Sequence, residues 1–217
     1  MNPNPAPNPP SRDQARAAAA PPPIPFPELG DKLQHVPVYV RPDVDFYQRR
    51  MGFLPDTIKL YLHVPWVAEF LFRFNNALMR DERNAIGEEL KYRLSAIVSR
   101  DSECAYCTSH HVGVFKQKFG YDEAQVERLL RHEEPLDVRE ALAREFVHQA
   151  SLDALGVTDE LRARMARTFT PQEYMEIVLL VGFWKMYNTM HNALGVAIEA
   201  PLGEYARFVK IQPEGSR

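Results

Sequence analysis

Apolar residues recur every three or four positions over most of the chain after about Leu54, which is the period of an amphipathic α-helix. One stripe lies within residues 64–79 and consists of Val67, Phe70, Leu71, Phe74 and Leu78. A second lies within residues 88–99 and consists of Leu90, Leu94, Ile97 and Val98. No alternating strand pattern competes with these stripes, although Val36–Val40 is compatible with a short extended segment. The pattern predicts an all-α fold in a single domain.

Capping residues mark where several helices begin. Thr170-Pro171-Gln172-Glu173 combines an N-cap, a first-turn proline and a capping-box glutamate. Asp137 with Glu140, and Thr158 with the acidic pair that follows it, carry similar signals. The predicted helices are Glu88–Ser99, Glu103–Phe119, Val138–Ser151, Asp159–Arg167 and Pro171–Asn188. The last one is apolar nearly all round from Ile177 to Trp184, so it should be buried, and it should end near Gly195.

The N-terminal region has a different composition. Ten of the 18 prolines fall in the first 27 residues, mixed with Asn and Ala. Proline fixes φ and supplies no backbone donor, so residues 1–27 are predicted to be a disordered tail. The helical domain is then expected to occupy residues 28–217.

Charge and hydropathy exclude two classes of partner. The net charge is −3, with 26 Lys and Arg against 29 Asp and Glu, and no basic run marks a nucleic-acid-binding face. The longest apolar run, Ile177 to Trp184, falls far short of the ~20 residues that span a bilayer. No secretory signal is visible near the N-terminus. We therefore expect a cytoplasmic protein that binds neither nucleic acid nor membrane.

Candidate chemistry is concentrated in one short segment. The only two cysteines form the motif Cys104-Ala105-Tyr106-Cys107, and His111 follows four residues later. A helix beginning near Asp101 or Ser102 would place Cys104, Cys107 and His111 on one stripe, with Cys104 in the first turn. Backbone N–H groups there stabilise a thiolate, which attacks peroxides or disulfides, and a second thiol can resolve the product. His111 would carry the proton.

Other readings of these residues stay open. Cys104, Cys107 and His111, with the neighbouring Glu103 as a fourth ligand, have the chemistry of a zinc site, or the cysteines could simply be buried packing residues. A structural disulfide is disfavoured in a reducing compartment. His110 points about 100° away from His111 on a helix, so only one of the pair can face the thiols. Tyr106, which could also line a pocket, and His191, which could also reach one, are interpreted as structural groups. The remaining histidines have no partner visible in the sequence and are interpreted as surface or core residues: His35, His63, His132 and His148.

The run from Ala96 to Arg100, followed by Glu103 to His111, resembles the carboxymuconolactone decarboxylase superfamily. It is most similar to the alkylhydroperoxidase D-like and peroxidase-related branches. Weaker similarities lie in Gly52-Phe53-Leu54-Pro55, in Tyr187-Asn188 and in Ala193-Leu194-Gly195-Val196. The resemblance covers most of the chain after about Met51.

The resemblance implies an all-helical fold, assembly into homotrimers or homohexamers, and peroxidase activity recycled by a thiol donor. It implies that Cys107 meets the peroxide and that His111 belongs to the proton relay, whereas the helix-terminus argument favours Cys104 as the more acidic thiol. The family relay usually includes a glutamate twelve residues before the first cysteine, and here that position is Tyr92. Glu88 or Glu89, one turn earlier, could replace it.

The sequence thus predicts a thiol-dependent peroxidase with catalytic Cys104, Cys107 and His111. Tyr92, Glu88, Tyr106 and His110 are candidate relay or pocket residues. Its expected partners are a hydroperoxide substrate and an unidentified thiol reductant, and no cofactor or metal is expected. The alternatives are a non-enzymatic helical oligomer acting as a redox sensor or binding protein, and a decarboxylase-like enzyme, although decarboxylases of this superfamily lack the cysteine pair.

Overall fold

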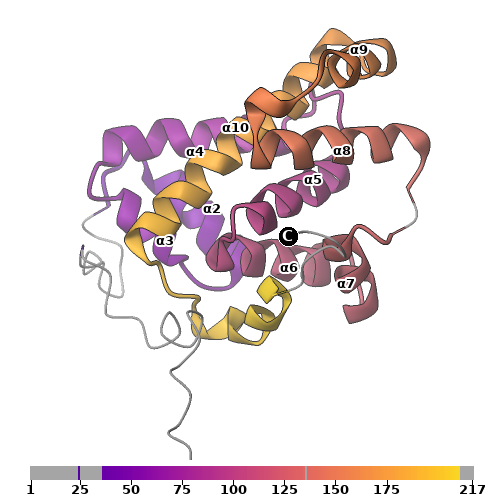
Figure 1. Ribbon diagram of the computed structural model, residues 1–217. Helices are drawn as coiled ribbons and strands as arrows, with labels where there is room; N and C mark the ends of the chain where they lie inside the picture. Colours follow the sequence, from indigo (N-terminus) through magenta and orange to yellow (C-terminus); the bar gives the residue numbers. More distant parts are fainter. Residues whose placement is uncertain (1–23, 25–35, 135, 211–217) are drawn as a thin grey trace, which may run out of the picture.

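The computed structural model describes residue 24, residues 36–134 and residues 136–210. These described parts are helical and contain no strand, which confirms the all-α prediction (Figure 1). The predicted tail, residues 1–27, lies outside the described residues except for Ile24, and His35 also lies outside them. Among the described helices, none has the length and apolar character required to cross a membrane.

The helices of the described residues follow in the order α2 (Arg41–Met51), α3 (Asp56–Tyr61), α4 (Pro65–Arg80), α5 (Glu88–Asp101), α6 (Ala105–Lys118), α7 (Glu123–Arg131), α8 (Val138–Leu152), η1 (Ala154–Gly156), α9 (Asp159–Thr168), α10 (Pro171–Leu194) and η2 (Ala200–Lys210). The five predicted helices are confirmed as α5, α6, α8, α9 and α10. The extended segment expected at Val36–Val40 is wrong: residues 38–40 form a turn that leads into α2, which has a proline in its first turn.

Helix α5 lies at the centre of the fold and packs against α4, α6, α7, α8 and α10. Every residue from Leu94 to Arg100 is buried. The Lys91 ammonium, which is fully buried, donates to the Leu78 carbonyl at 2.6 Å and lies 2.9 Å from the Glu176 carboxylate. A buried charge is tolerated when it is paired in this way. These contacts fix α5 against α4 and α10.

Two apolar stripes face outward in the single chain. On α4, Trp66 and Phe70 are 60% and 72% exposed, and the buried face is formed instead by residues such as Phe72. On α10, Val178 and Leu179 are exposed. The expectation that α10 is buried is therefore wrong for this face, because no further layer among the described residues covers its outer side.

The predicted caps explain how α8 and α10 begin and end. Thr170 and Glu173 form the predicted capping box of α10. Asp137 caps α8 as expected, but the Glu140 carboxylate pairs with Arg93 rather than returning to the cap. Helix α10 ends at Gly195, whose φ of 60° is the left-handed conformation that glycine adopts most readily.

The C-terminal segment η2 packs closely on α6. A Cβ atom at Gly113 would lie 3.2 Å from the Leu202 side chain, so the absence of a side chain at Gly113 permits this approach. The contact holds the segment that precedes η2, including Glu199, over the N-terminal half of α6.

Candidate active site

The turn between α5 and α6 places the first cysteine at a helix terminus. Glu103 adopts a left-handed φ of 50°, which is uncommon for a residue with a side chain, and α6 begins at Ala105. Cys104 is therefore the N-cap of α6. The sequence had predicted that it would lie in the first turn of the helix, one position or more further in. Its Sγ accepts the backbone N–H of Cys107, with a distance of 3.5 Å between sulfur and nitrogen. The thiol thus caps the helix as a serine hydroxyl would.

The two thiols are free, buried and electrostatically unequal. A hydrogen bond from the Cys107 thiol, assisted by His191 and the Cys107 N–H, outweighs burial and lowers the pKa of Cys104 to about 5. Burial, together with the neighbouring Cys104 sulfur, raises the pKa of Cys107. At neutral pH the pair therefore holds one negative charge, on Cys104, and one proton, on Cys107.

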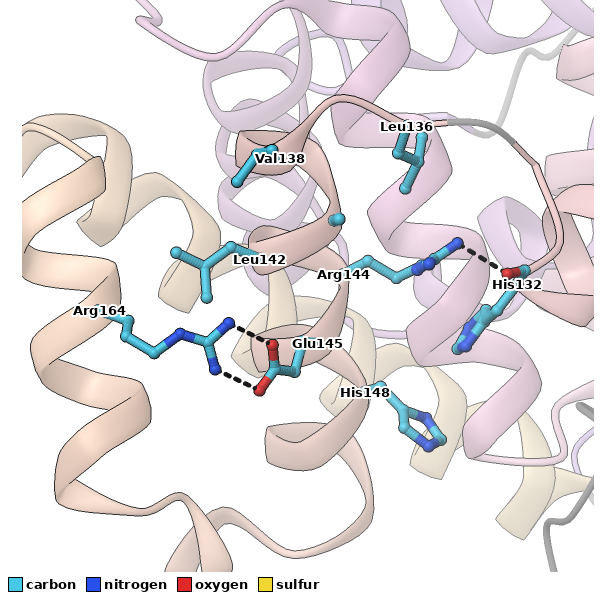
Figure 2. A pocket seen from close by; sticks show the side chains of 9 residues that line it. His132, Leu136, Val138, Leu142, Arg144, Glu145, His148 and Arg164 are labelled. Carbon is cyan, nitrogen blue, oxygen red and sulfur yellow. Dashed lines mark hydrogen bonds and ion pairs between the residues drawn. The ribbon is translucent and has the colours of Figure 1, made fainter.

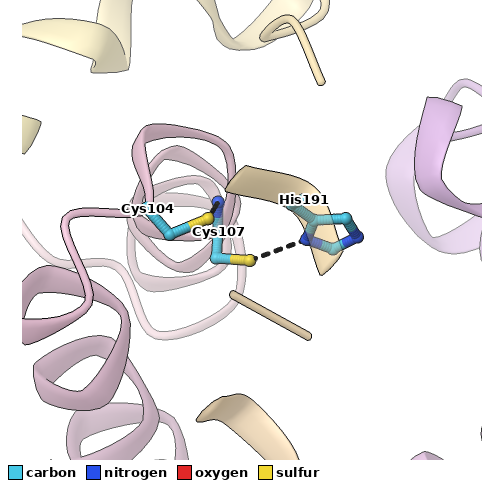
Figure 3. A group of neighbouring side chains, drawn as sticks. All are labelled: Cys104, Cys107 and His191. Atoms are coloured by element: carbon cyan, nitrogen blue, oxygen red, sulfur yellow. Dashed lines mark hydrogen bonds between the residues drawn. The ribbon is translucent and has the colours of Figure 1, made fainter. Parts of the chain in front are cut away.

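His191 is the histidine that contacts the thiol pair (Figure 3). Its Nδ1 lies 3.0 Å from Cys107 Sγ, and its Nε2 lies 2.6 Å from Thr57 Oγ1 and 3.1 Å from the Tyr61 hydroxyl. Because both ring nitrogens have partners, the ring is fixed in orientation. The side-chain amide of Asn192, the next residue on α10, donates to the Ser102 carbonyl at 2.9 Å and holds this end of α10 against the turn before Cys104.

Within the described part of the chain, His111 makes no hydrogen bond to either thiol. Its ring packs against Trp184 at 4.4 Å and against Tyr92 at 6.0 Å between centroids, and its buried Nε2 has no hydrogen-bond partner in the described structure. Burial lowers the pKa of His111 to about 3, so the ring is neutral at neutral pH. The prediction that His111 contacts the thiols is therefore wrong. His191, which the sequence analysis had interpreted as structural, makes that contact instead.

A carboxylate that the sequence analysis missed lies next to this site. Glu199 Oε1 accepts the Tyr106 hydroxyl at 2.6 Å and the Asp56 N–H at 2.7 Å, and Oε2 lies 2.9 Å from His110 Nε2. Burial alone would raise the pKa of Glu199, but the hydrogen bonds and the charge of His110 lower it to about 2. The Tyr106 hydroxyl also accepts the Thr57 N–H at 3.1 Å, which connects this network to the residue that holds His191.

The other two candidate relay residues form a separate cluster. The Tyr92 hydroxyl accepts hydrogen bonds from Arg50 at 3.0 Å and from Arg80 at 2.7 Å. Glu88 lies 3.8 Å and 3.9 Å from the same two guanidinium groups and pairs with Lys118. The structure thus brings Glu88 and Tyr92, which lie one turn apart on α5, to the same arginines, but neither contacts a thiol.

One small cavity connects these groups. Its volume is about 90 Å³, and its lining includes Cys107, His111, His191 and Tyr92. Most of the remaining lining is aromatic or aliphatic, and Cys104 does not take part in it. Cys107 is therefore the thiol that a molecule in the cavity would meet, and Cys104 lies behind it.

A second hollow is larger, about 520 Å³, and lies between α8, α9 and the turn after α7 (Figure 2). It contains no cysteine, and Arg164 and Glu145 pair across it through two hydrogen bonds of 2.8 Å. His148, which had no partner visible in the sequence, lies 2.8 Å from the Asp101 carboxylate. The charged groups of this hollow thus have ion-pair partners, in part outside its lining, and the thiols lie at the smaller cavity.

The cysteine pair also has the chemistry of metal ligands. Cys104 Sγ, Cys107 Sγ and a ring nitrogen of His191 all lie within 4.8 Å of one another. Zinc uses sulfur and imidazole ligands but takes four, so this group would be one ligand short of a closed site. The zinc set suggested by the sequence is thus changed, with His191 in the place of His111, and Glu103 lies outside the group.

Solved structures that share this fold include an alkylhydroperoxidase AhpD core and other peroxidase-related proteins, in agreement with the fold that the sequence resemblance implies. An uncharacterized peroxidase-related protein from Silicibacter sp. TM1040 has a TM-score of 0.73 at 20% identity, covering 85% of this chain and 95% of that one. An alkylhydroperoxidase AhpD core, an uncharacterized peroxidase-related protein from Ralstonia eutropha JMP134, has a TM-score of 0.73 at 19% identity, covering 87% and 98%.

The debrominase Bmp8 shares the fold, with a TM-score of 0.67 at 20% identity over 80% of this chain and 92% of that one. A cysteine-to-alanine variant of Bmp8 is known in complex with 2,3,4-tribromopyrrole. In sequence, the chain is 24% identical to the uncharacterized protein YnjA of Escherichia coli (strain K12) over 169 residues, which cover 76% of this chain and 90% of YnjA. No protein-family model matches the chain. Among proteins with this fold, a debrominase thus stands beside peroxidase-related proteins.

Proposed function

We propose that the protein is a thiol-dependent peroxidase in which Cys107 reduces a hydroperoxide and Cys104 resolves the product. The observation that carries this proposal is the arrangement of three groups around one sulfur. Cys107 lines the cavity, His191 Nδ1 lies 3.0 Å from its Sγ, and the acidic thiol of Cys104 lies on the other side. A proton acceptor and a resolving thiolate are the two groups that a peroxidatic thiol needs.

In the proposed reaction, His191 takes the proton of the Cys107 thiol, and the Cys107 thiolate attacks the terminal peroxide oxygen. An S–O bond forms as the O–O bond breaks, and the leaving alkoxide takes the proton from His191. The Cys104 thiolate then attacks Cys107 Sγ, forms the disulfide and releases hydroxide, which takes a proton from solvent. Two thiols and one hydroperoxide thus give a disulfide, an alcohol and water, and an external thiol donor must reduce the disulfide.

The proton acceptor in this proposal is His191 instead of His111. A base that works near neutral pH needs a pKa in that range, and the lowered pKa of buried His111 makes it a poor acceptor. His111 lines the same cavity, so its proposed role is to shape the space in which the hydroperoxide binds.

Trapping the intermediate tests the order of the two thiols. Cys104→Ser should reduce one equivalent of hydroperoxide and stop at a sulfenic acid on Cys107, which dimedone labels and mass spectrometry locates. Cys107→Ser should consume no hydroperoxide, and His132→Gln, in the other hollow, should behave as wild type. Full turnover by Cys107→Ser, or a sulfenic acid located on Cys104, would overturn the proposed roles.

A second candidate function is reductive dehalogenation, which the structural similarity to the debrominase Bmp8 favours. The same dithiol can supply two electrons, so that an aryl bromide and two thiols give the arene, bromide, a proton and the disulfide. The two activities are distinguished by incubating reduced protein with a bromopyrrole and with cumene hydroperoxide, and by measuring bromide release and disulfide formation in each. Disulfide formation with neither compound would favour the non-enzymatic alternative.

A further inference from the structure

A cluster of hydrogen-bond donors lies in the wall of the cavity that contains Cys107. Arg50, Arg80 and Tyr92 all line this cavity, and their side chains come from three different helices. The Tyr92 ring is only 4% exposed, and the two arginine side chains are 20% and 18% exposed. Holding two guanidinium groups on one phenol in a mostly apolar wall is costly without a compensating anion.

The charges around this cluster do not balance. Among the described residues, Glu88 is the carboxylate that pairs with these arginines, at the long distances of 3.8 Å and 3.9 Å. It also pairs more closely with Lys118, so three cations share one carboxylate. The other side-chain partners of Arg80 are neutral: it donates to the Asn76 amide oxygen at 2.8 Å, and its guanidinium lies 5.3 Å from the centroid of the Phe46 ring.

Two donors of the cluster lack acceptors among the described residues, and the buried Glu88 Oε1 also lacks a hydrogen-bond partner there. The Tyr92 oxygen accepts from both arginines, and within the described residues nothing accepts the hydrogen of its own hydroxyl. The buried Nε of Arg80 likewise has no hydrogen-bond acceptor in the part of the chain that the structure describes. Buried donors are normally satisfied, so the cluster has the chemistry of a site for an anionic acceptor.

We infer that Arg50, Arg80 and Tyr92 bind the carboxylate of the substrate, so that the enzyme acts on small organic acids. This inference rests on the proposed function only in taking the cavity at Cys107 as the active site. Arginine pairs carboxylates through two parallel hydrogen bonds, and the aromatic wall, including Trp184 and Tyr187, fits the carbon skeleton. The reducible group, a hydroperoxide in the first candidate function, is then held toward Cys107.

The test measures binding without any peroxide. Reduced wild-type protein is alkylated with iodoacetamide, and the rate at Cys107 is followed by mass spectrometry in the presence of benzoate or its neutral isostere benzamide. Propionate and propionamide form a smaller matched pair. The carboxylates should protect Cys107 at concentrations at least about tenfold lower than the amides, because hydrogen bonds to a charged acceptor are worth roughly 1.5–3 kcal/mol.

Matched variants locate the site. Arg80→Gln should raise the concentration of benzoate that gives half-protection by about ten- to a hundredfold. Arg80→Lys keeps the charge and should lie between Arg80→Gln and wild type. Arg73→Gln removes the same charge from the same helix at a side chain that is 67% exposed and paired with Glu69, and it should leave protection unchanged. Circular dichroism spectra and melting temperatures verify that each variant is folded.

Equal protection by the acid and amide of each pair would overturn the inference, as would an unchanged benzoate concentration in Arg80→Gln. Neither result would affect the proposed peroxidase activity, which is measured by trapping the sulfenic acid. Conversely, if the protein binds benzoate through Arg80 but forms no sulfenic acid, the inferred anion site stands and the proposed peroxidase reaction is wrong.

Discussion

Replacing His191 by phenylalanine should raise the pKa of the Cys104 thiol while preserving the packing of the ring. The imidazole lies among three tyrosine rings at centroid distances of 4.8–6.1 Å, and a phenyl ring occupies nearly the same volume. The substitution removes one of the groups that stabilise the Cys104 thiolate, and the hydrogen bonds from Cys107 remain. The new midpoint should therefore lie above about 5 and below the ordinary value of 9.0.

The full shift sets the upper limit of the effect. Four pKa units correspond to about 5 kcal/mol of preferential stabilisation of the thiolate. At pH 7 a thiol with a pKa of about 5 is almost wholly ionised, whereas one at 9.0 is about 1% ionised. Titration of the thiolate by its ultraviolet absorbance reads this fraction directly in the reduced protein.

Rates respond differently from ionisation, because a less acidic thiolate is a stronger nucleophile. With a Brønsted coefficient of about 0.45, a rise of four units makes the thiolate about 60-fold more reactive. At pH 7 this nearly cancels the lost ionisation, and the rate at which Cys104 closes the disulfide should change by about twofold or less. At pH 5.5 the same change slows closure by up to about 40-fold, so the kinetic experiment has to be made below pH 6.

His111→Phe is the matched control, because it removes an equally buried imidazole from the same cavity. It should leave the thiolate midpoint unchanged, while Thr57→Val, which leaves Nε2 of His191 with the Tyr61 hydroxyl as its partner, should raise the midpoint slightly. Identical titration curves for wild type and His191→Phe would refute the assignment of His191. A shifted curve for His111→Phe alone would restore the role that the sequence gave to His111.

Three further predictions concern stability and assembly. Lys91→Met leaves the Glu176 carboxylate buried without its cation and should lower the free energy of unfolding by about 3 kcal/mol. A decrease of less than about 1 kcal/mol in denaturant titration would contradict this. Because the folded pKa of Cys104 is depressed, the reduced protein should gain stability relative to Cys104→Ser as pH rises from about 5 to 9, and a constant difference would contradict the shift. We also propose that the exposed face with Trp66 and Phe70 joins copies of the chain in a homotrimer or homohexamer; sedimentation should show a smaller species for Phe70→Asp, and a monomeric wild type would contradict this.

Helix positions were predictable because their signals are local. A cap lies within three residues of the backbone group that it satisfies, so Thr170 and Thr158 marked the starts of α10 and α9 correctly. Which face of a helix is buried depends on packing against distant elements. The exposed stripes on α4 and α10 could not be distinguished from core by periodicity alone.

The candidate site was predictable to the same extent. The spacing of Cys104 and Cys107 indicated a redox pair, because that spacing is itself local. The two groups that complete the site are separated from these cysteines by more than 80 residues: the Cys107–His191 contact spans 84 positions, and Glu199 lies farther along the chain. Neither residue stands in a recognisable motif, so only the packing of α10 and η2 on α6 reveals them.

The 84-residue separation between Cys107 and His191 also affects how this protein is made and protected. During synthesis the cysteines leave the ribosome well before His191 and Glu199, so the contribution of His191 to the acidity of Cys104 is absent until α10 has docked. An incompletely folded chain therefore exposes two weakly ionised thiols, which react slowly with oxidants at neutral pH. The hydrogen bonds from Cys107 arise when α6 forms, whereas the part of the Cys104 acidity that depends on His191 is acquired only when α10 docks, and that part would be lost again wherever the end of α10 opens.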